Sequence, residues 1–425
     1  MFWRATSPCN LKWTQEVKTN MQKLTRVAGF AGVLALSVGG VGTTVQHAFA
    51  DQGVVGYVYV NDNTAGVNTV AGYAEGPDGS LTALPGSPFA VGGAGLGKGL
   101  GSQNSIEASS DGRYLLVADG GSNQISVLDI NAGGTLTAVP NSPFSSGGTE
   151  PVSIAVHQNL VYVANDGVAA TTTTSATPAN YAGFTLSFGG QLAPLAAPPV
   201  QVPGAANDLG DVLINRYGTN LVGTEVASGL IDSFSVNARG ALSADTQIPS
   251  QGPGPFGSAF RPTGPSQLYV SNAHGGTLAG TVSAFNVAAN GQLTSIGASP
   301  FADQQTAPCW VSISPNGQYL FTANAGSGSY SSYAINVDGS LTLLGDLPMP
   351  TLSNGKSPTP LDTTVDALGR NLYGIDNGLP GVSMIHLNAG YMLANPTSPI
   401  ALPVGATPSG IVAVGVGNGF GLFPF

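Results

Sequence analysis

A short segment that ends in a polar residue occurs seven times in this chain, and this repetition limits the fold more than any other feature. Each copy is a tetrapeptide of small, apolar or aromatic residues with Asn, Asp or Glu at or near its end. The polar residues that close the seven copies are Asp62, Asp119, Asn165, Glu225, Asn272, Asn324 and Asp376. Successive copies lie 46 to 60 residues apart, near the period of about 40–50 residues typical of four-stranded propeller blades.

Two further sequence motifs also recur along the chain, one of them seven times and the other four times. A glycine turn followed two residues later by Leu or Met occurs seven times, with its glycine at Gly79, Gly134, Gly190, Gly240, Gly291, Gly339 and Gly390. Ser-Pro-Phe occurs at 87–89, 142–144 and 299–301, and Ser-Pro-Ile occurs at 398–400. Glycine turns between alternating segments are typical of β-hairpins. Each unit therefore predicts four antiparallel strands followed by a loop that crosses to the next unit.

The two ends of the chain complement each other. The first unit lacks an inner strand, whereas residues 408–414 resemble an inner strand with nothing after them. An open solenoid is the alternative, but a missing strand at one end and a surplus strand at the other favour a closed ring. We predict an all-β, seven-bladed β-propeller with four-stranded antiparallel blades, closed by the C-terminal inner strand and formed as a single domain by residues 51–425.

The composition agrees with this fold and excludes several classes of function. The chain contains 61 Gly and 30 Pro among 425 residues, which disfavours long helices. Hydrophobic residues make up 42%, too many for a disordered chain. The net charge of -10 argues against a nucleic-acid partner, because binding to phosphates requires clustered Lys and Arg.

The first 50 residues read as a targeting segment. Within residues 21–50, two basic residues precede an apolar stretch, and Ala48-Phe49-Ala50 is a small-x-small cleavage site. We expect a secretory signal peptide cleaved after Ala50, with residues 1–20 as an upstream extension or a mis-assigned start. The expected location is the periplasm or the medium, with no membrane span after cleavage; an uncleaved anchor is the alternative.

The repeats also resemble a known family. The segment 313–324, ISPNGQYLFTAN, and the segment 162–165, YVAN, together with the Gly-x-Leu-Thr hairpins, are similar to the seven-bladed propeller lactonases with YVTN-type repeats. The resemblance extends over nearly all of residues 53–425. It implies a 6-phosphogluconolactonase-like or related lactone-handling enzyme, although the family also includes exported members without an assigned role.

The strand-end residues define one candidate ligand surface. In a propeller, the loops after the second strands and the loops between blades share one end, which we call the top; the other hairpins form the bottom. Long loops at one end are where propellers usually bind their ligands. Alternatively, Asn and Asp at strand ends bond the adjacent backbone and only shape the turn. The candidate ligand-binding residues at the top are Asp62, Asp119, Asn165, Asp211, Asn272, Asn324, Asp362 and Asp376.

Two residues are candidates for catalysis. The lactonase resemblance implies that Glu225, the only Glu in the strand-end series, acts as a general base in lactone opening. His274, in the following top loop, is the second candidate. Active family members resemble one another in a His-rich stretch entering blade three and an Arg-His pair entering blade four; this chain has EPVS at 150–153 and NDLGD at 207–211. The site is therefore altered.

The charge distribution narrows the ligand. Five arginines are expected in bottom hairpins: Arg113, Arg216, Arg239, Arg261 and Arg370. Only Lys98 and Lys356 are expected in top loops, so a phosphorylated lactone lacks the guanidinium groups that suit its phosphate. We expect a monomer without metal or cofactor that takes a small neutral sugar or lactone at the top. The alternative is a non-catalytic binding propeller for a carbohydrate or protein partner.

Overall fold

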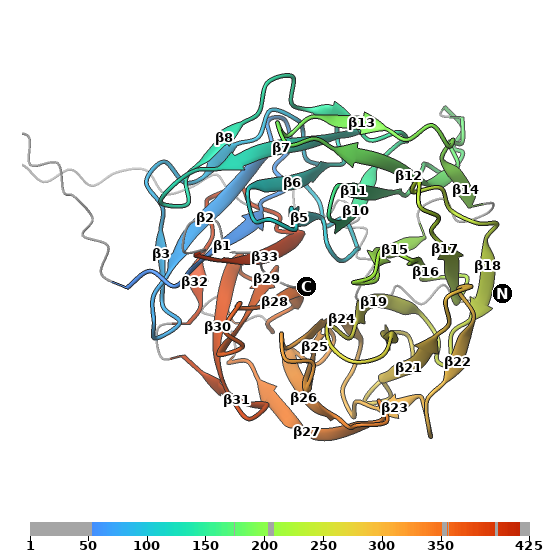
Figure 1. Cartoon of the computed structure of the whole chain (residues 1–425). Coiled ribbons are helices and arrows are strands. Elements are labelled where there is room, and N and C mark those ends of the chain that lie inside the picture. The colour runs from blue at the N-terminus through green and yellow to red at the C-terminus, as the bar shows by residue number, and fades with distance from the viewer. Residues whose placement is uncertain are drawn as a thin grey trace, which may run out of the picture.

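The computed structural model describes residues 53–173, 175–202, 208–350, 355, 357–395 and 398–416. These residues form seven antiparallel sheets arranged as blades around a central axis (Figure 1). This arrangement confirms the predicted all-β, seven-bladed propeller. The predicted segments 1–20 and 21–50 lie outside the described residues. No helix in the described part of the chain could cross a membrane.

Each blade begins with an inner strand beside the axis. From blade 1 to blade 7 the inner strands are β33 (Gly410–Gly415), β5 (Ile106–Ala108), β10 (Pro151–His157), β15 (Leu209–Ile214), β19 (Pro255–Phe260), β24 (Pro308–Ile313) and β28 (Pro360–Val365). Six of them have six or seven residues, whereas β5 has three. Because β5 is short, the residues just before it do not pair with the second strand of blade 2.

The second strands carry the repeated tetrapeptides. They are β1 (Gly56–Asn61), β6 (Tyr114–Asp119), β11 (Leu160–Asn165), β16 (Asn220–Glu225), β20 (Gln267–Asn272), β25 (Tyr319–Asn324) and β29 (Asn371–Asp376). Nearly every residue in them is buried, on both faces, and in β6 all six residues are buried. Neighbouring blades pack against both faces of each sheet, so these strands read as continuous apolar runs rather than as alternating ones.

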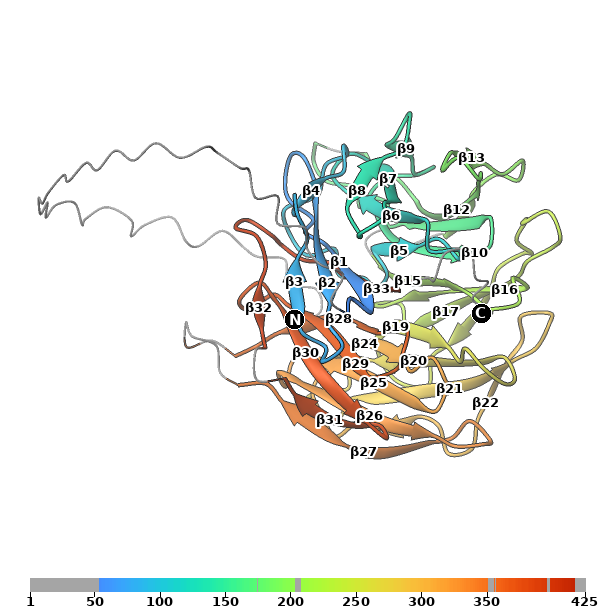
Figure 2. The same cartoon turned by 60° about the vertical axis from the view of Figure 1, so that its left-hand side comes forward.

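The third strands lie outside the second ones. They are β2 (Thr69–Glu75), β7 (Gln124–Ile130), β12 (Ala179–Leu186), β17 (Leu230–Ser235), β21 (Thr281–Val287), β26 (Ser329–Ile335) and β30 (Gly381–Asn388). The outermost strands are β3 (Leu81–Ala83), β8 (Leu136–Ala138), β13 (Leu192–Pro194), β18 (Thr246–Pro249), β22 (Leu293–Ser295), β27 (Leu341–Pro348) and β31 (Tyr391–Ala394). Figure 2 shows the outer strands at the rim of the blades.

In five blades the outermost position is filled by two short pieces. The second pieces are β4 (Phe89–Ala90), β9 (Phe144–Ser145), β14 (Val200–Val202), β23 (Phe301–Ala302) and β32 (Ile400–Ala401), and each pairs with the third strand of its blade. Four of these pieces follow the Ser-Pro landmark. The serine hydroxyl accepts a hydrogen bond from the third strand where the outer strand is broken, as in Gly72 N to Ser87 Oγ at 2.9 Å. The landmark thus replaces a lost ladder bond.

The ring closes as predicted. β33 pairs with β1 in antiparallel register from Gly56↔Gly415 to Asn61↔Gly410, so the C-terminal strand completes the blade that the N-terminal strands begin. In Figure 1 the last strand lies next to the first one at the inner edge of this blade.

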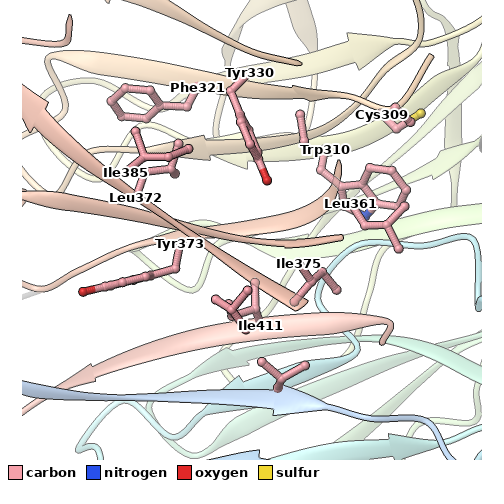
Figure 3. Packing of buried hydrophobic residues seen from close by; sticks show 14 of the residues in the cluster. Cys309, Trp310, Phe321, Tyr330, Leu361, Leu372, Tyr373, Ile375, Ile385 and Ile411 are labelled. Atoms are coloured by element: carbon pink, nitrogen blue, oxygen red, sulfur yellow. The ribbon is translucent and has the colours of Figure 1, made fainter. Parts of the chain in front are cut away.

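Apolar side chains fill the spaces between blades. In Figure 3, Phe321, Tyr330 and Leu372 of blades 6 and 7 pack together, and Ile411 of β33 extends the cluster to blade 1. Buried tyrosines at the repeat position also bind the next blade: the hydroxyls of Tyr59 and Tyr162 donate to Gly134 O and Gly240 O at 2.7 and 2.6 Å. Because the acceptors are the hairpin glycines, two sequence landmarks meet at each of these contacts.

Candidate functional site

The strand-end residues lie at the top, as predicted. Six of the seven are the last residues of their second strands, and Asp62 directly follows β1 and stays in register through Asp62 N to Thr69 O at 3.0 Å. All seven are at most 3% exposed. They form a ring beneath the top loops rather than on the surface.

The side chains of this ring make hydrogen bonds within the protein. Asp62 accepts from Thr69 Oγ1 at 2.8 Å, and Asp119 accepts from Asn68 Nδ2 at 2.9 Å and Ser126 Oγ at 2.6 Å. These partners belong to the segments that begin the third strands. The carboxylates therefore hold the turns at the top, as the alternative interpretation of strand-end Asp predicts.

The three asparagines of the ring and Asp376 also make hydrogen bonds within the protein. Asn165 Nδ2 donates to Ser146 O and to Asn180 Oδ1, both at 3.1 Å. Asn272 Nδ2 donates to two hydroxyls of β21, and Asn324 Nδ2 donates to two hydroxyls of β26. Asp376 accepts from three backbone N–H groups, those of Thr359, Gly378 and Leu379, at 2.7–3.1 Å.

The centre of the ring is filled by the chain itself. Residues 102–104, which we call the channel segment, precede β5 and bond to inner strands of other blades. Ser102 Oγ donates to Val152 O of blade 3 at 2.7 Å, and the Trp310 indole of blade 6 donates to Ser102 O at 2.9 Å. The segment thus joins inner strands on opposite sides of the axis.

Gln103 is the centre of this segment. Its backbone N–H donates to Gly210 O at 2.9 Å, its amide nitrogen donates to Ser258 O at 2.8 Å, and its amide oxygen accepts from Val311 N at 2.9 Å. These three partners lie in blades 4, 5 and 6. A Cβ added at Gly257 would collide with the Gln103 side chain and with Cys309 O, so β19 requires glycine opposite the segment.

The two inner-strand candidates, Asp211 and Asp362, bind the channel segment. Asp211 accepts from Asn104 Nδ2 at 3.1 Å, from Ser153 Oγ at 3.1 Å, and from Ser258 N and Oγ at 3.0 and 2.8 Å. Asp362 accepts from Asn104 N at 3.3 Å and from Thr363 N at 2.9 Å. Both carboxylates therefore accept hydrogen bonds from the channel segment of the protein itself.

A third carboxyl group shares this region. Glu107 of β5 is half-buried, and burial together with the charges of Asp362 and Asp211 raises its pKa to about 8. Burial likewise raises the pKa of Asp211 to about 7, and burial and the charge of Asp211 raise that of Asp362 to about 8. Burial near the axis thus favours the protonated form of these three acids much more than in water. Among the described residues, no group of three or more His, Cys, Asp or Glu is placed to hold a metal ion.

Glu225 lies apart from the channel. Its Oε1 accepts from Gln247 Nε2 of the outermost strand β18 at 2.5 Å. Burial and the charge of Asp232 raise the pKa of Glu225 to about 7. Asp232 in turn accepts from the Tyr181 hydroxyl of blade 3 at 2.7 Å. Glu225 therefore belongs to a carboxyl cluster between blades 3 and 4.

His274 lies in the top loop between β20 and β21. Burial lowers its pKa, while the charge of Asp208 acts in the opposite direction. The same Asp208 raises the pKa of Glu225 by its charge, and it accepts bonds from the N–H groups of Ala227 and Ser228. Asp208 thus lies within electrostatic reach of both catalytic candidates, whereas Asp211 binds Asn104, Ser153 and Ser258 near the axis.

The basic residues lie where they were predicted. Of the Lys and Arg side chains that the structure describes, only Lys98 lies in a top loop, and its nitrogen is 3.8 Å from Glu150 Oε1. The five arginines lie in bottom hairpins. Arg216 donates to Pro262 O and Gly264 O of the next blade, and Arg261 donates to Gly317 O of the one after. Lys356 lies outside the described residues.

Comparison with known proteins supports the resemblance drawn from the repeats. The family model described as lactonase, 7-bladed beta-propeller matches residues 219–408, from the turn before β16 to the segment before β33. This chain resembles the seven-bladed β-propeller lactonases. A search of curated proteins finds no match.

Solved structures with the same fold include lactonases and proteins without an assigned role. A periplasmic gluconolactonase of Pseudomonas aeruginosa is 16% identical, with a TM-score of 0.64 over 85% of this chain and 99% of that one. A candidate 6-phosphogluconolactonase of Bacteroides fragilis is 16% identical, with a TM-score of 0.63 over 86% and 99%. A functionally unknown protein of Desulfotomaculum acetoxidans is 11% identical, with a TM-score of 0.63 over 85% and 99%. At these identities the likeness shows the fold alone.

Three residues of this lactonase-like propeller escaped sequence reasoning. Gln103 and Glu107 line the axis, and Asp208 lies within electrostatic reach of both catalytic candidates. One signal for the channel segment was present: four other inner strands begin with proline, whereas β5 follows the polar run Ser102-Gln103-Asn104-Ser105. Polar residues at the start of an inner strand indicate that this segment leaves the blade.

Proposed function

We propose that this protein is an exported carbohydrate-binding propeller of the lactonase type that does not hydrolyse lactones at its axis. The observation that carries the proposal is the channel segment, which occupies the axis and bonds to the inner strands of blades 3 to 7. The likeness to lactonases supports a sugar or a related compound as the ligand, because that is the class of molecule named for its structural neighbours.

The chemistry of the top argues against catalysis there. A general base must reach the proton that it removes, but Glu225 is 2% exposed and bonded to Gln247. Lactone hydrolysis also develops negative charge on an oxygen atom, which needs nearby donors or cations. In the described top loops the only cation is Lys98, which is paired with Glu150.

One observation favours a second candidate, hydrolysis of an uncharged sugar lactone. The pKa of Glu225 is raised to about 7 by burial and by Asp232, which is the range expected of a general base at neutral pH. Asp208 and His274 lie within electrostatic reach of one another. In this candidate function, Glu225 is the general base that activates water, and His274 is the second catalytic residue. The lactone is uncharged because the described top loops offer no guanidinium for a phosphate.

Export is part of the proposal and rests on the pattern of residues 21–50. N-terminal sequencing of the protein recovered from the periplasm or medium tests it. The expected first residue is Asp51. A product that retains residues 21–50, or one found only in the cytoplasm, would contradict export.

A lactone panel separates the two candidate functions. Wild type, Glu225→Gln and the exposed-carboxylate control Asp346→Asn are assayed in a pH-stat with glucono-δ-lactone and its 6-phosphate. The proposal predicts rates equal to spontaneous hydrolysis for all three proteins. Hydrolysis by wild type and Asp346→Asn that Glu225→Gln abolishes would establish the second candidate. Hydrolysis that survives Glu225→Gln would also contradict the proposal and place the site elsewhere.

A further inference from the structure

A cavity of about 340 Å³ opens at the bottom of the propeller, away from the predicted ligand surface. It lies between blades 3 and 4, where the hairpin β10–β11 meets the hairpins β15–β16 and β17–β18. Its volume is within the range of about 300–1,000 Å³ of small-molecule sites. The two blades touch at its edge, since a Cβ at Gly218 would fall 2.8 Å from His157 Nε2.

The charge of this cavity is opposite to that of the chain. Its lining includes Arg239 and His157 but no Asp or Glu, although the chain carries 22 acidic and 12 basic residues. Within the described residues, the Arg239 guanidinium is exposed and makes no hydrogen bond or ion pair. An unpaired guanidinium in a cavity without carboxylates favours an anionic group, and its planar donors match a carboxylate.

The hairpin that carries Arg239 is held in place. Asn237 Oδ1 accepts from the backbone N–H groups of Arg239 and Ala241 at 2.8 and 3.1 Å. The buried Tyr162 hydroxyl of blade 3 donates to Gly240 O at 2.6 Å. The cation is therefore presented by a turn with little freedom, which lowers the entropy cost of binding.

The rest of the lining suits a hydroxylated ligand. Tyr217 is 51% exposed and lines the cavity, and the Arg216 guanidinium lies 4.5 Å from the centre of its ring. Asn159 and Thr185 contribute an amide and a hydroxyl. An aromatic ring that offers an apolar surface beside amides, a hydroxyl and a cation fits a molecule with C–H faces, hydroxyl groups and one negative charge.

We propose that this cavity binds a sugar acid, with Arg239 on the carboxylate, Tyr217 against the sugar C–H face, and Asn159 on hydroxyl groups. The inference deepens the proposed carbohydrate-binding function and rests on it. It moves the binding site from the top, where the ring of polar residues is buried, to the bottom of blades 3 and 4.

Titration calorimetry on the purified protein tests the inference. The ligands are D-gluconate and D-glucuronate as the acids, D-glucose as the neutral sugar, and inorganic phosphate as the plain anion. Wild type is compared with Arg239→Gln, Tyr217→Ala and the matched control Arg370→Gln. Arg370 is also an exposed bottom-hairpin arginine but lies outside the cavity lining. Thermal melts confirm that all variants are folded.

The expected result is binding of a sugar acid by wild type and Arg370→Gln with equal affinity. Arg239→Gln should weaken it about 10- to 100-fold, as expected for loss of a hydrogen-bonded charge. Sugar-acid binding that persists in both Arg239→Gln and Tyr217→Ala would overturn this inference but leave a carbohydrate-binding function. Phosphate binding as tight as gluconate binding would overturn the sugar assignment. Lactone hydrolysis in the separate panel would overturn the proposed function alone, and absence of any sugar binding would overturn both.

Discussion

The top and bottom ends of the blades differ in their charged residues and in the bonds that these residues make: the described arginines all lie at the bottom, beside acids such as Asp78 and Asp338. At the top, Asp62, Asp119 and Asp376 are buried and accept bonds at the top turns, Asp119 also from Asn68 of the preceding blade. At the bottom, Arg216 and Arg261 donate to the next blade. These buried carboxylates are not exposed to a ligand, whereas the guanidinium of Arg239 is. The polar residue that recurs at the strand end of all seven units therefore serves to shape the turn.

The largest expected effect is on the channel. Asp211→Ala removes the acceptor for Asn104, Ser153 and Ser258, leaving buried donors without a partner. We expect the free energy of unfolding to fall by about 3 kcal/mol or more. Urea denaturation measures it. The exposed control Asp346→Ala should change stability by about 0.5 kcal/mol or less; equal effects of the two substitutions would contradict the channel assignment.

The next effect concerns the fit of the channel segment. Gly257→Ala places a methyl group against the Gln103 side chain and Cys309 O, and such overpacking costs about 1–3 kcal/mol. Gly99, in the loop ahead of the segment, has open space at its Cβ position. Gly99→Ala is the matched control and should leave the melting temperature nearly unchanged. If Gly257→Ala is tolerated equally well, the segment does not occupy the axis as described.

The acids near the axis predict how stability depends on pH. Glu107, Asp211 and Asp362 have folded pKa values raised to about 7–8, above their unfolded values near 4. Between these limits the folded state binds more protons, so the free energy of unfolding falls as pH rises from about 4 to 8. His157 and His274, whose pKa values burial lowers, act in the opposite sense only below about pH 6.5.

Calorimetric melts at pH 5, 6, 7 and 8 measure this dependence. We expect the melting temperature to fall across the series by about 2 °C or more. The double substitution Glu107→Gln and Asp362→Asn should make the curve less steep, while other buried acids with raised pKa values, such as Asp62 and Asp166, keep part of the slope. A melting temperature that rises from pH 5 to pH 8 would contradict the raised pKa values.

The smallest effect is expected at the bottom. Arg261→Gln removes the bonds to Gly317 O and Asn336 O of blade 6, which contribute about 1 kcal/mol in a partly exposed setting. Arg370→Gln, whose guanidinium makes no hydrogen bond with the described residues, should have no measurable effect on stability. Equal stability of the two variants in urea would show that the bottom arginines do not hold the blades together.

The fold could be predicted because its signals repeat. Strand-end residues such as Asn165 and hairpin glycines such as Gly190 recur at nearly constant spacing, and each copy reinforces the others. The surplus strand at 408–414 predicted ring closure, which the pairing of β33 with β1 confirms. The positions of Asp211 and Asp362 near the axis follow from the same pattern.

The site could not be predicted to the same depth. The channel segment occurs once, so Gln103 has no counterpart in the other units that would draw attention to it. The bottom cavity is formed by hairpins of two different blades, and Asn159 of blade 3 meets Tyr217 and Arg239 of blade 4 only when these blades pack. Periodicity shows what the units share, whereas a site depends on what one unit does differently.

Hydrogen-exchange mass spectrometry with and without D-gluconate tests the contrast between the two ends most directly. The account predicts slow exchange of residues 102–104 in both states, and ligand-dependent protection of the bottom hairpins at 157–160, 215–219 and 236–241. Protection confined to the top loops at 226–229 and 273–280, or rapid exchange of residues 102–104, would contradict it.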